Sequence, residues 1–368
     1  MNKNKLKRLL SFLWAFPLML IWRYTFFIHK YRLIKIRSDR IGHFAPDGAE
    51  QIARLKLENN NRKLFCFDQV ISNHQWAIML ERKLPVFRFL TYVFFWNEKL
   101  YNDYKFTEIG TKTGSRDIYN LYFKTDVKIK FTTNENKKVF KWLEKFGFKA
   151  HEKFICLLVR DDEYLKKYFK DKNWDYHTYR NSDIQNYKRG IEWLISKGFW
   201  VIRMGKLNSQ KLKMNSKKFI DFSFVKEKSD LIDIWLFANC HGCITTGTGT
   251  DAISHIYEKP CLGINWLPVM GIQSYHNIIS YPKYLYDKNK NLLSIKESIK
   301  CNFYSTEDFS MNGITIKDLS PFQIKNAFEE FYKYKLENQN VELVYKEKNK
   351  NFWLQVLKFD KSKKIHHE

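Results

Sequence analysis

One segment, residues 239–267 (NCHGCITTGTGTDAISHIYEKPCLGINWL), constrains the fold more than any other part of the chain. Its residues 243–245 have the apolar character of the end of a short buried strand. Residues 246–250 form a turn of threonine and glycine that is too small to cover its own backbone. Helical spacing follows over 251–257, and a Lys-Pro pair ends that helix before a second apolar strand at 261–265. Strand, turn, helix and strand make half of a doubly wound sheet.

This turn is a candidate anion site. At the carboxyl end of a strand it offers unpaired N–H groups and threonine hydroxyls, which match phosphate oxygens. The expected donor-site and phosphate-binding residues are Thr246, Gly247, Thr248, Gly249, Thr250 and Asp251. Asp251 could reach a ribose hydroxyl or only stabilise the start of the helix. A tight turn that binds nothing is the alternative, because glycine-rich turns are common punctuation.

Strand and helix alternate through the rest of the chain. In the first half, strands at 33–36 and 64–67 are each followed by a helix, at 49–57 and 73–83, and a third such unit is expected at 85–96. The pattern restarts near 151, where an apolar strand covers 154–159; further strands are expected at 199–204 and 219–224, helices at 183–197 and 231–238. A chain of 368 residues suits two domains.

The predicted fold class is therefore α/β: two Rossmann-like doubly wound domains facing a central cleft, with a short N-terminal hydrophobic helix. The predicted segments are a basic and hydrophobic helix (1–30), a first domain (31–150), a second domain (151–320) and C-terminal helices with a charged, loose tail (321–368). Two opposed sets of strand ends could hold two substrates, one in each domain.

The N-terminus suggests contact with a membrane. Four of the first eight residues are Lys or Arg, and residues 9–22 are apolar with Pro17 among them. This run is shorter than the roughly 20 residues of a spanning helix. No small-residue cleavage site follows it. Trp14, Trp22 and Tyr24 beside cations suit a helix that lies in the cytoplasmic interface of a membrane. The alternative is an ordinary first helix packed on its own protein.

The net charge of +25 favours anionic partners such as nucleic acid, anionic lipid or a phosphorylated substrate. Lysine is spread through every region, however, so a general preference for lysine also explains the charge. The six cysteines follow no disulfide framework and fit a reducing cytoplasm. Cys240 and Cys243 have the spacing of a metal knuckle, but no second pair accompanies them, and no metal site is predicted.

Three arginines are candidates for binding phosphate in the second domain. Arg160 and Arg203 follow strands, where a doubly wound sheet has its crevice, and Arg180 precedes a helix. A guanidinium fork matches phosphate oxygens and can neutralise a departing diphosphate. Surface exposure or ion pairs with neighbouring aspartates are the alternative for each of them.

Two residues of the first domain are candidate catalytic bases. His43 lies in a glycine-containing turn at 37–44, and Asp47 lies near the start of the next helix. Either could take a proton from a hydroxyl, and imidazole does so near neutral pH with little tuning. Capping the helix or packing beside Phe44 is the alternative for His43.

Several chemistries lack their motifs. The chain has no GxxxxGK[ST], no GxGxxG after the first strand, no GxSxG and no HExxH. It also has no DxD pair on a loop after a strand, so we expect group transfer without a metal, with arginines and main-chain amides in place of the cation.

The segment DLIDIWLFANCHGCITTGTGTDAISHIYEKPCLGINWLP resembles the donor-side signature of a family of bacterial glycosyltransferases that act in surface-carbohydrate assembly. Supporting segments occur in the same order over residues 34–331: IRSDRIGHFAPDGAE, LLVRDDEYL, HTYRNSDIQNY, GFWVIRMGK and LSPFQIKNAFEEF. The resemblance implies a GT-B fold, an acceptor in the first domain and a nucleotide sugar in the second. His43 would then face the donor turn, with the three arginines near it.

The resemblance implies the reaction class and no particular substrate. Together with the basic, apolar N-terminus, it leads us to expect a glycosyltransferase peripheral to the cytoplasmic face of the membrane, with a lipid-linked or polysaccharide acceptor. The nucleotide sugar is a substrate, and no cofactor is expected. A sugar-nucleotide epimerase or hydrolase of the same two-domain plan is a rival. A basic binder of nucleic acid or membrane surface is another, although no motif of interleaved aromatic and basic residues predicts nucleic-acid binding.

Overall fold

The computed structural model describes residues 3–58, 62–101, 105–111, 117–168, 174–275, 277–340 and 343–361. The chain forms two compact units, Met1–Thr132 and Thr133–Glu368. Each unit contains a parallel sheet with helices around it, which confirms the predicted α/β class. The units divide earlier than the expected 150, because helix α8 (Thr133–Glu144) packs against the second unit. There Trp235 Nε1 donates to Asn136 Oδ1 at 2.8 Å.

Unit 1 has a three-stranded parallel sheet in the order β2-β1-β3. Its strands are β1 (Arg32–Ile36), β2 (Lys63–Phe67) and β3 (Thr107–Ile109), and its helices are α1 (Lys3–Leu10), α2 (Phe12–Tyr24), α3 (Phe26–His29), α4 (Ile41–Glu58), α5 (His74–Glu81), α6 (Leu90–Tyr101) and α7 (Leu121–Lys124). The expected third strand near 85 is only a bridge between Val86 and Phe65. β3 takes the third place instead, from a short stretch without visible periodicity.

Helix α4 begins earlier than predicted, at Ile41 and not at 49. Pro46 lies inside it, where the sequence pattern placed a break. The helix closes tightly against α5, since a Cβ on Gly48 would lie 2.6 Å from a methyl carbon of Leu80. His43 therefore lies in the first turn of α4 and not in the preceding loop, which ends at Arg40.

Unit 2 is built on a six-stranded parallel sheet in the order β6-β5-β4-β7-β8-β9. Its strands are β4 (Phe154–Leu158), β5 (Trp200–Arg203), β6 (Phe219–Asp221), β7 (Gly242–Thr245), β8 (Cys261–Trp266) and β9 (Ile278–Pro282). The chain starts in the middle with β4, winds outward to β6, and returns to the other side of β4 with β7. This is the doubly wound order, and its direction reverses between β4 and β7.

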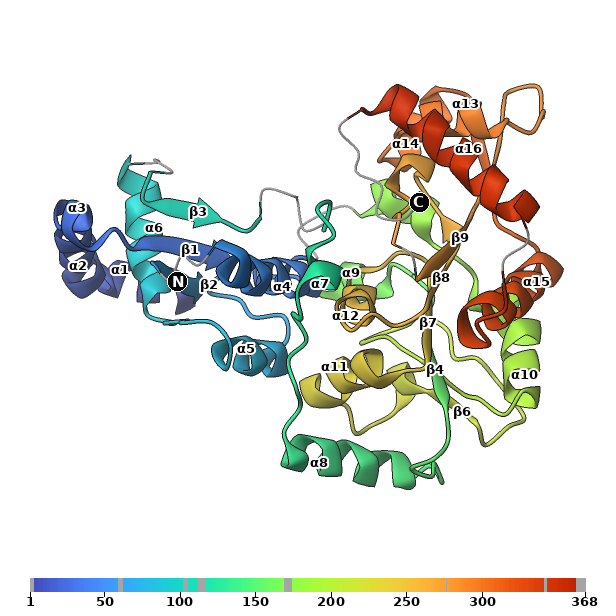
Figure 1. Ribbon diagram of the computed structural model, residues 1–368, viewed down its shortest axis with the longest axis horizontal. Helices are drawn as coiled ribbons and strands as arrows, with labels where there is room; N and C mark the ends of the chain where they lie inside the picture. The colour runs from blue at the N-terminus through green and yellow to red at the C-terminus, as the bar shows by residue number, and fades with distance from the viewer. Residues whose placement is uncertain are drawn as a thin grey trace. The chain divides into compact units, whose positions relative to one another are not determined.

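Helices cover both faces of this sheet (Figure 1). One face carries α10 (Lys188–Ser196) and α15 (Pro321–Phe331), whose apolar residues form one core with Ile155 and Leu157 of β4. Towards the other face lie α8, α11 (Asp230–Asn239) and α12 (Ala252–Ile256). The side chains of Asp183 and Ser229 cap the helical segments that follow them, and they accept hydrogen bonds from Gln185 N and Ile232 N.

The remaining elements of unit 2 lie mostly in parts of the sequence without a clear pattern. They are α9 (Glu163–Tyr168), η1 (Asp175–Arg180), η2 (Ile184–Tyr187), η3 (Phe222–Phe224), η4 (Gly249–Asp251), η5 (Val269–Gly271), β10 (Tyr284–Tyr286), α13 (Ile295–Lys300), α14 (Thr306–Met311), β11 (Thr315–Lys317), η6 (Tyr332–Leu336) and α16 (Leu343–Phe359). β10 and β11 form a separate antiparallel pair. The helices expected after 320 are α15 and α16; most of the expected loose tail lies outside the described residues.

Residues 3–29 form three short helices, α1 to α3, and not one. α2 packs on α6 through Ala15 and Met19, and Trp96 Nε1 of α6 donates to Ser11 Oγ at 3.0 Å. Among the described residues, none of the helices is both long and apolar enough to cross a bilayer.

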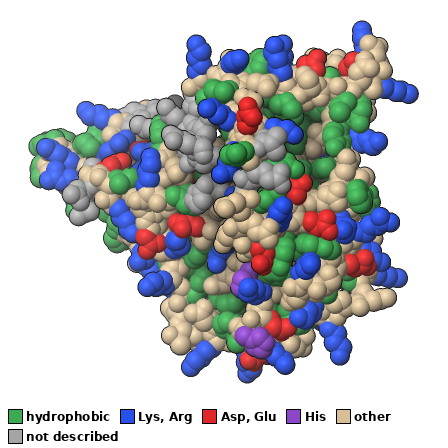
Figure 2. Space-filling model, turned by 45° about the vertical axis from the view of Figure 1, so that its right-hand side comes forward, with side chains coloured by type: hydrophobic (Ala, Val, Ile, Leu, Met, Phe, Trp, Pro, Cys, Tyr) green, Lys and Arg blue, Asp and Glu red, His purple; other side chains and the backbone are tan. Residues whose placement is uncertain are grey.

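Lysine and arginine side chains are scattered over the face shown in Figure 2, with acidic and apolar side chains between them. The positive charge on this face is not collected into one patch. This distribution fits the general preference for lysine that the sequence suggests.

The contact between α10 and α15 leads to a stability prediction. A Cβ on Gly190 would lie 2.7 Å from a ring carbon of Phe328, which is fully buried. Gly190→Ala should gain about 1 kcal/mol of helix propensity but lose about 1–3 kcal/mol to overpacking. We expect a net decrease in the free energy of unfolding, measured by urea denaturation. Lys188→Ala, at an exposed position of α10, is the control and should stay within about 0.5 kcal/mol. A Gly190→Ala variant more stable than the wild type would contradict this packing.

Candidate functional site

The candidate site lies at the point where the strand order of unit 2 reverses. The chain after β4 and the chain after β7 meet there, at the carboxyl ends of two adjacent parallel strands. Thr246 N donates to Leu158 O at 3.1 Å, and Arg160 N donates to Thr246 Oγ1 at 2.9 Å. These bonds fasten the predicted turn to the loop that carries Arg160. Ligands of doubly wound sheets bind at such a reversal, because the two loops diverge and leave a crevice.

The turn has the open backbone that the sequence predicts. Gly247 has φ +76°, and a Cβ there would lie 3.0 Å from the Trp266 ring, so both conformation and space require glycine. Its own N–H is used, because it donates to Thr245 Oγ1 at 3.0 Å. The N–H groups of Thr248, Gly249 and Thr250 have no acceptor among the described residues. Three adjacent donors are therefore free to bind an anion.

The helix after the turn is shorter than expected. A single 3₁₀ turn, η4, precedes α12, which has only five residues. A helix of that length adds little dipole to the site. The free N–H groups, and not a helix end, are what the turn offers.

Arg160 and Arg180 stand beside this turn without a carboxylate. Arg180 donates to Gly247 O, and Arg160 Nε is buried with no hydrogen-bond partner among the described residues. Burial first, and then the charge of Arg180, lowers the pKa of Arg160 to about 10, while Asp162 acts on it only through weaker long-range attraction. The Arg160 guanidinium remains charged at neutral pH. Two neighbouring cations that form no ion pair within the described chain make a strong attractor for an anion.

Arg203 does not join them. Its side chain is only 2% exposed and pairs with Asp221, with Nη1 and Oδ2 3.1 Å apart. The same nitrogen donates to the carbonyl of Gln210. The sequence analysis gave an ion pair as the alternative to phosphate binding for Arg203. The partner, Asp221, is not among the aspartates next to the three arginines in the sequence. We leave Arg203 out of the site.

Two other predicted residues have mainly structural contacts. Thr246 is buried and holds Arg160 N, as described above. Asp251 is also buried, accepts the hydroxyl of Thr245 at 2.7 Å, and has a raised pKa because of its burial. Its carboxylate stabilises the turn through the Thr245 hydroxyl, which also accepts a hydrogen bond from Gly247 N. Of the predicted set, Gly249 thus remains exposed and Gly247, Thr248 and Thr250 remain half-buried.

The loop that carries Arg180 is held by residues that sequence reasoning missed. Lys283 Nζ donates to Asn181 O at 2.6 Å and pairs with Asp318 at 2.8 Å. Asn265 Nδ2 donates to Ser182 Oγ at 2.8 Å and to Asp318 at 3.2 Å. Burial lowers the pKa of Lys283, although the attraction of Asp318 opposes this. These residues are far apart in the sequence, so no local motif could reveal them.

In unit 1, His43 lies beyond the carboxyl end of β1, in the first turn of α4. Burial lowers its pKa, and the nearby charges of Arg37 and Arg40 lower it further. The imidazole is therefore neutral at pH 7, the form that accepts a proton. This is the protonation state that a general base needs.

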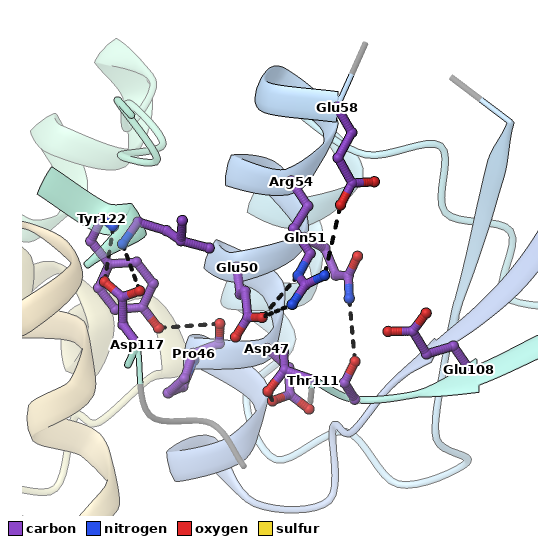
Figure 3. A network of polar contacts seen from close by, with 12 residues as sticks. Pro46, Asp47, Glu50, Gln51, Arg54, Glu58, Glu108, Thr111, Asp117 and Tyr122 are labelled. Atoms are coloured by element: carbon purple, nitrogen blue, oxygen red, sulfur yellow. Dashed lines mark hydrogen bonds and ion pairs between the residues drawn. The ribbon is translucent and has the colours of Figure 1, made fainter. Parts of the chain in front are cut away.

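Asp47, the second candidate base, is engaged in a buried network (Figure 3). Its side chain is fully buried and bound by Arg37 through two hydrogen bonds, of 2.8 and 3.0 Å. On the same helix, α4, Glu50 binds Arg54. Nearby, Asp117 accepts a hydrogen bond from the N–H of Tyr122, which lies on α7. Both oxygens of this buried carboxylate accept hydrogen bonds from Arg37, so they are occupied within the protein and not directed at a substrate hydroxyl. The position of Asp47 favours a structural role over the predicted catalytic one.

Cys240 and Cys243 are buried in unit 2. Within the described ranges, no three His, Cys, Asp or Glu side chains are grouped so that they could hold a metal ion.

Comparison of the sequence with protein-family models and with curated proteins gives no match. Comparison with solved structures gives several. A family 9 glycosyl transferase from Veillonella parvula has 10% sequence identity and a TM-score of 0.50, over 84% of this chain and 98% of that one. E. coli ADP-heptose lps heptosyltransferase II has 9% identity and a TM-score of 0.39, over 82% and 98%. UDP-GlcNAc 2-epimerase from Methanocaldococcus jannaschii has 12% identity and a TM-score of 0.28, over 86% and 80%.

The likeness to the Veillonella protein extends over both units, and it confirms the predicted GT-B fold class. At this identity the likeness concerns the fold. The predicted cleft, with His43 opposite the donor turn, stays a prediction.

The pairing of Arg203 with Asp221 leads to a second prediction. Arg203→Met should lower the free energy of unfolding by about 3–5 kcal/mol, because Asp221 is left buried without its counter-charge. Chemical denaturation measures this loss. Arg203→Met/Asp221→Asn, which removes both charges, is the control and should recover part of it. A single variant as stable as the wild type would show that the pair does not hold the end of β5.

Proposed function

We propose that this protein is a glycosyltransferase that moves a sugar from a nucleotide-sugar donor to a lipid-linked or polysaccharide acceptor in bacterial surface-glycan synthesis. One observation carries the proposal: two arginines without a carboxylate partner in the described chain lie at the strand reversal of unit 2, next to a turn with free N–H groups. The GT-B fold and the family resemblance of the sequence support it.

In the proposed reaction the acceptor oxygen attacks the anomeric carbon of the sugar. The bond from that carbon to the diphosphate oxygen breaks, and the nucleoside diphosphate leaves with the electron pair. Arg160, Arg180 and the N–H groups of the turn would stabilise the negative charge that develops on it. Two fixed guanidinium groups supply the positive charge that a divalent cation would otherwise supply, so we propose that transfer needs no metal.

His43 is the proposed base for the acceptor hydroxyl. Its neutral imidazole can take the hydroxyl proton as the new bond forms. Arg37 and Arg40 disfavour the imidazolium and so keep this histidine ready to accept a proton at neutral pH.

Donor binding tests the arginine pair directly. Thermal unfolding with UDP-, GDP-, CMP- and TDP-sugars should reveal at least one donor that raises the melting temperature, because a ligand that binds only the folded state stabilises it. Arg160→Gln and Arg180→Gln should each weaken that donor by roughly tenfold or more, since each removes a charge-assisted hydrogen bond of about 1.5–3 kcal/mol.

Arg189→Gln is the matched control. Arg189 is exposed on α10, and its replacement should leave donor affinity unchanged. Unchanged affinity in both site variants would contradict the site. Release of free sugar without an acceptor would instead favour the epimerase or hydrolase alternative.

The pH dependence of turnover tests His43. Because its pKa is lowered, activity should fall only when the pH drops below the ordinary histidine range, where the imidazole becomes protonated. Arg40→Gln removes one of the charges that lower this pKa, so the acid limb of the profile should move to higher pH. Lys288→Gln, an exposed change in unit 2, should not move it.

His43→Ala should reduce turnover by about 10²–10⁴-fold without changing donor affinity. Full turnover in this variant, or an acid limb that Arg40→Gln leaves in place, would remove His43 from the mechanism.

A further inference from the structure

The three N-terminal helices expose an unusual amount of apolar surface. α2 is apolar along almost its whole length, and Leu13 and Ile21 are 78% and 61% exposed. Phe27 and Ile28 of α3 are 69% and 70% exposed. Other large apolar residues that are at least a third exposed on these helices are Leu6, Leu9, Leu10, Phe12, Trp14, Leu18, Leu20 and Tyr24. Isolated exposed apolar residues are ordinary, but a continuous run of this kind indicates a surface with a partner.

The opposite side of α2 is firmly packed. Ser11, which directly precedes α2, and Ala15 and Met19 within it are spaced four residues apart and buried on the side of α6. Arg23 Nη1 donates to Asn97 Oδ1 of α6 at 2.6 Å, which fixes the far end of α2. The sequence left open whether this segment packs on the protein or lies on a membrane. In the structure α2 is packed on one side only.

Charge indicates which partner fits. The first 38 residues contain nine Lys or Arg and no Asp or Glu. Lys7, Arg8 and Lys30 are exposed beside the apolar side chains. The acidic side chains of nearby elements are partly neutralised, since Glu98 pairs with Lys35 and Glu108 with Arg32. Apolar side chains bordered by cations, with tryptophan and tyrosine among them, match the interface of an anionic bilayer.

We propose that the exposed face of α1 to α3 is a docking surface for an anionic lipid bilayer. α2 has thirteen residues and is about 20 Å long, less than the roughly 30 Å of hydrocarbon that a spanning helix must cross. The helices would lie in the interface, with Leu13, Ile21 and Phe27 among the acyl chains and the cations at the headgroups. The apolar contacts hold the protein there, and the cations select anionic lipid.

Vesicle sedimentation of the full chain tests this proposal without any measurement of glycosyl transfer. The wild type should pellet with phosphatidylcholine vesicles that contain phosphatidylglycerol, and more weakly with phosphatidylcholine alone. Leu13→Asp should weaken binding by roughly tenfold or more, because the free energy gained by moving a leucine side chain from water into the bilayer is lost. Lys7→Gln and Lys30→Gln should each weaken binding to the anionic vesicles by about fivefold.

Matched controls lie in unit 2. Met311→Asp, at a residue that is 84% exposed, and Lys288→Gln should bind vesicles like the wild type. All the replaced residues are exposed, so thermal unfolding should show that each variant is folded. If Leu13→Asp were unfolded, Ile21→Asp would serve as the second variant.

Three results would overturn the proposal. The first is a wild type that stays in the supernatant with anionic vesicles, and the second is a Leu13→Asp variant that pellets as the wild type does. The third is a dimer in light scattering that Leu13→Asp dissociates without any change in vesicle binding, because the face would then cover a second copy of the chain.

Discussion

The hydrogen bond from Arg160 N to Thr246 Oγ1 joins the two halves of the second sheet at the place where they diverge. β4 starts the sheet and β7 starts its return, so the loops after these two strands belong to opposite windings. Through this bond Thr246 links the loop after β7 to the loop after β4. Arg180 links its own loop to the turn by donating a hydrogen bond to Gly247 O. Together with the pairing of β4 and β7, these contacts hold the free N–H groups and the two guanidinium groups near one another. The anion site is thus a consequence of strand order, completed by one threonine and one glycine.

Two kinds of arginine follow from this geometry. Arg203 ends a strand on one side of the reversal, and a buried aspartate neutralises it. Arg160 lies two residues after the end of β4, at the reversal itself, and forms no ion pair within the described chain. A buried charge without a partner is costly, and a protein keeps one where a ligand supplies the opposite charge. The difference between these two arginines is the strongest physical argument that the site binds an anion.

Much of the second unit could be predicted from the sequence, because its strands are short, apolar and separated by turn residues. β4, β5, β7 and β8 lie where the pattern indicates, and Gly247 has the positive φ that its position suggests. The sequence pattern gave wrong predictions where local signals conflict with packing. Pro46 led us to place the start of α4 too late, although the proline lies inside the helix. β3 has only three residues, too few for a recognisable alternation of apolar and polar side chains. Side-chain partners could not be predicted, because Asp221, Lys283 and Asp318 meet their partners through the fold and not through sequence spacing. The apolar N-terminus was recognisable, but which of its faces is covered depends on α6.

The most direct measurement of the central claim is a crystal structure with the nucleoside diphosphate that stabilises the protein most. The account predicts phosphate oxygens within hydrogen-bond distance of the Arg160 and Arg180 guanidinium groups and of the N–H groups of Thr248 to Thr250. A diphosphate bound elsewhere, with both arginines untouched, would contradict it.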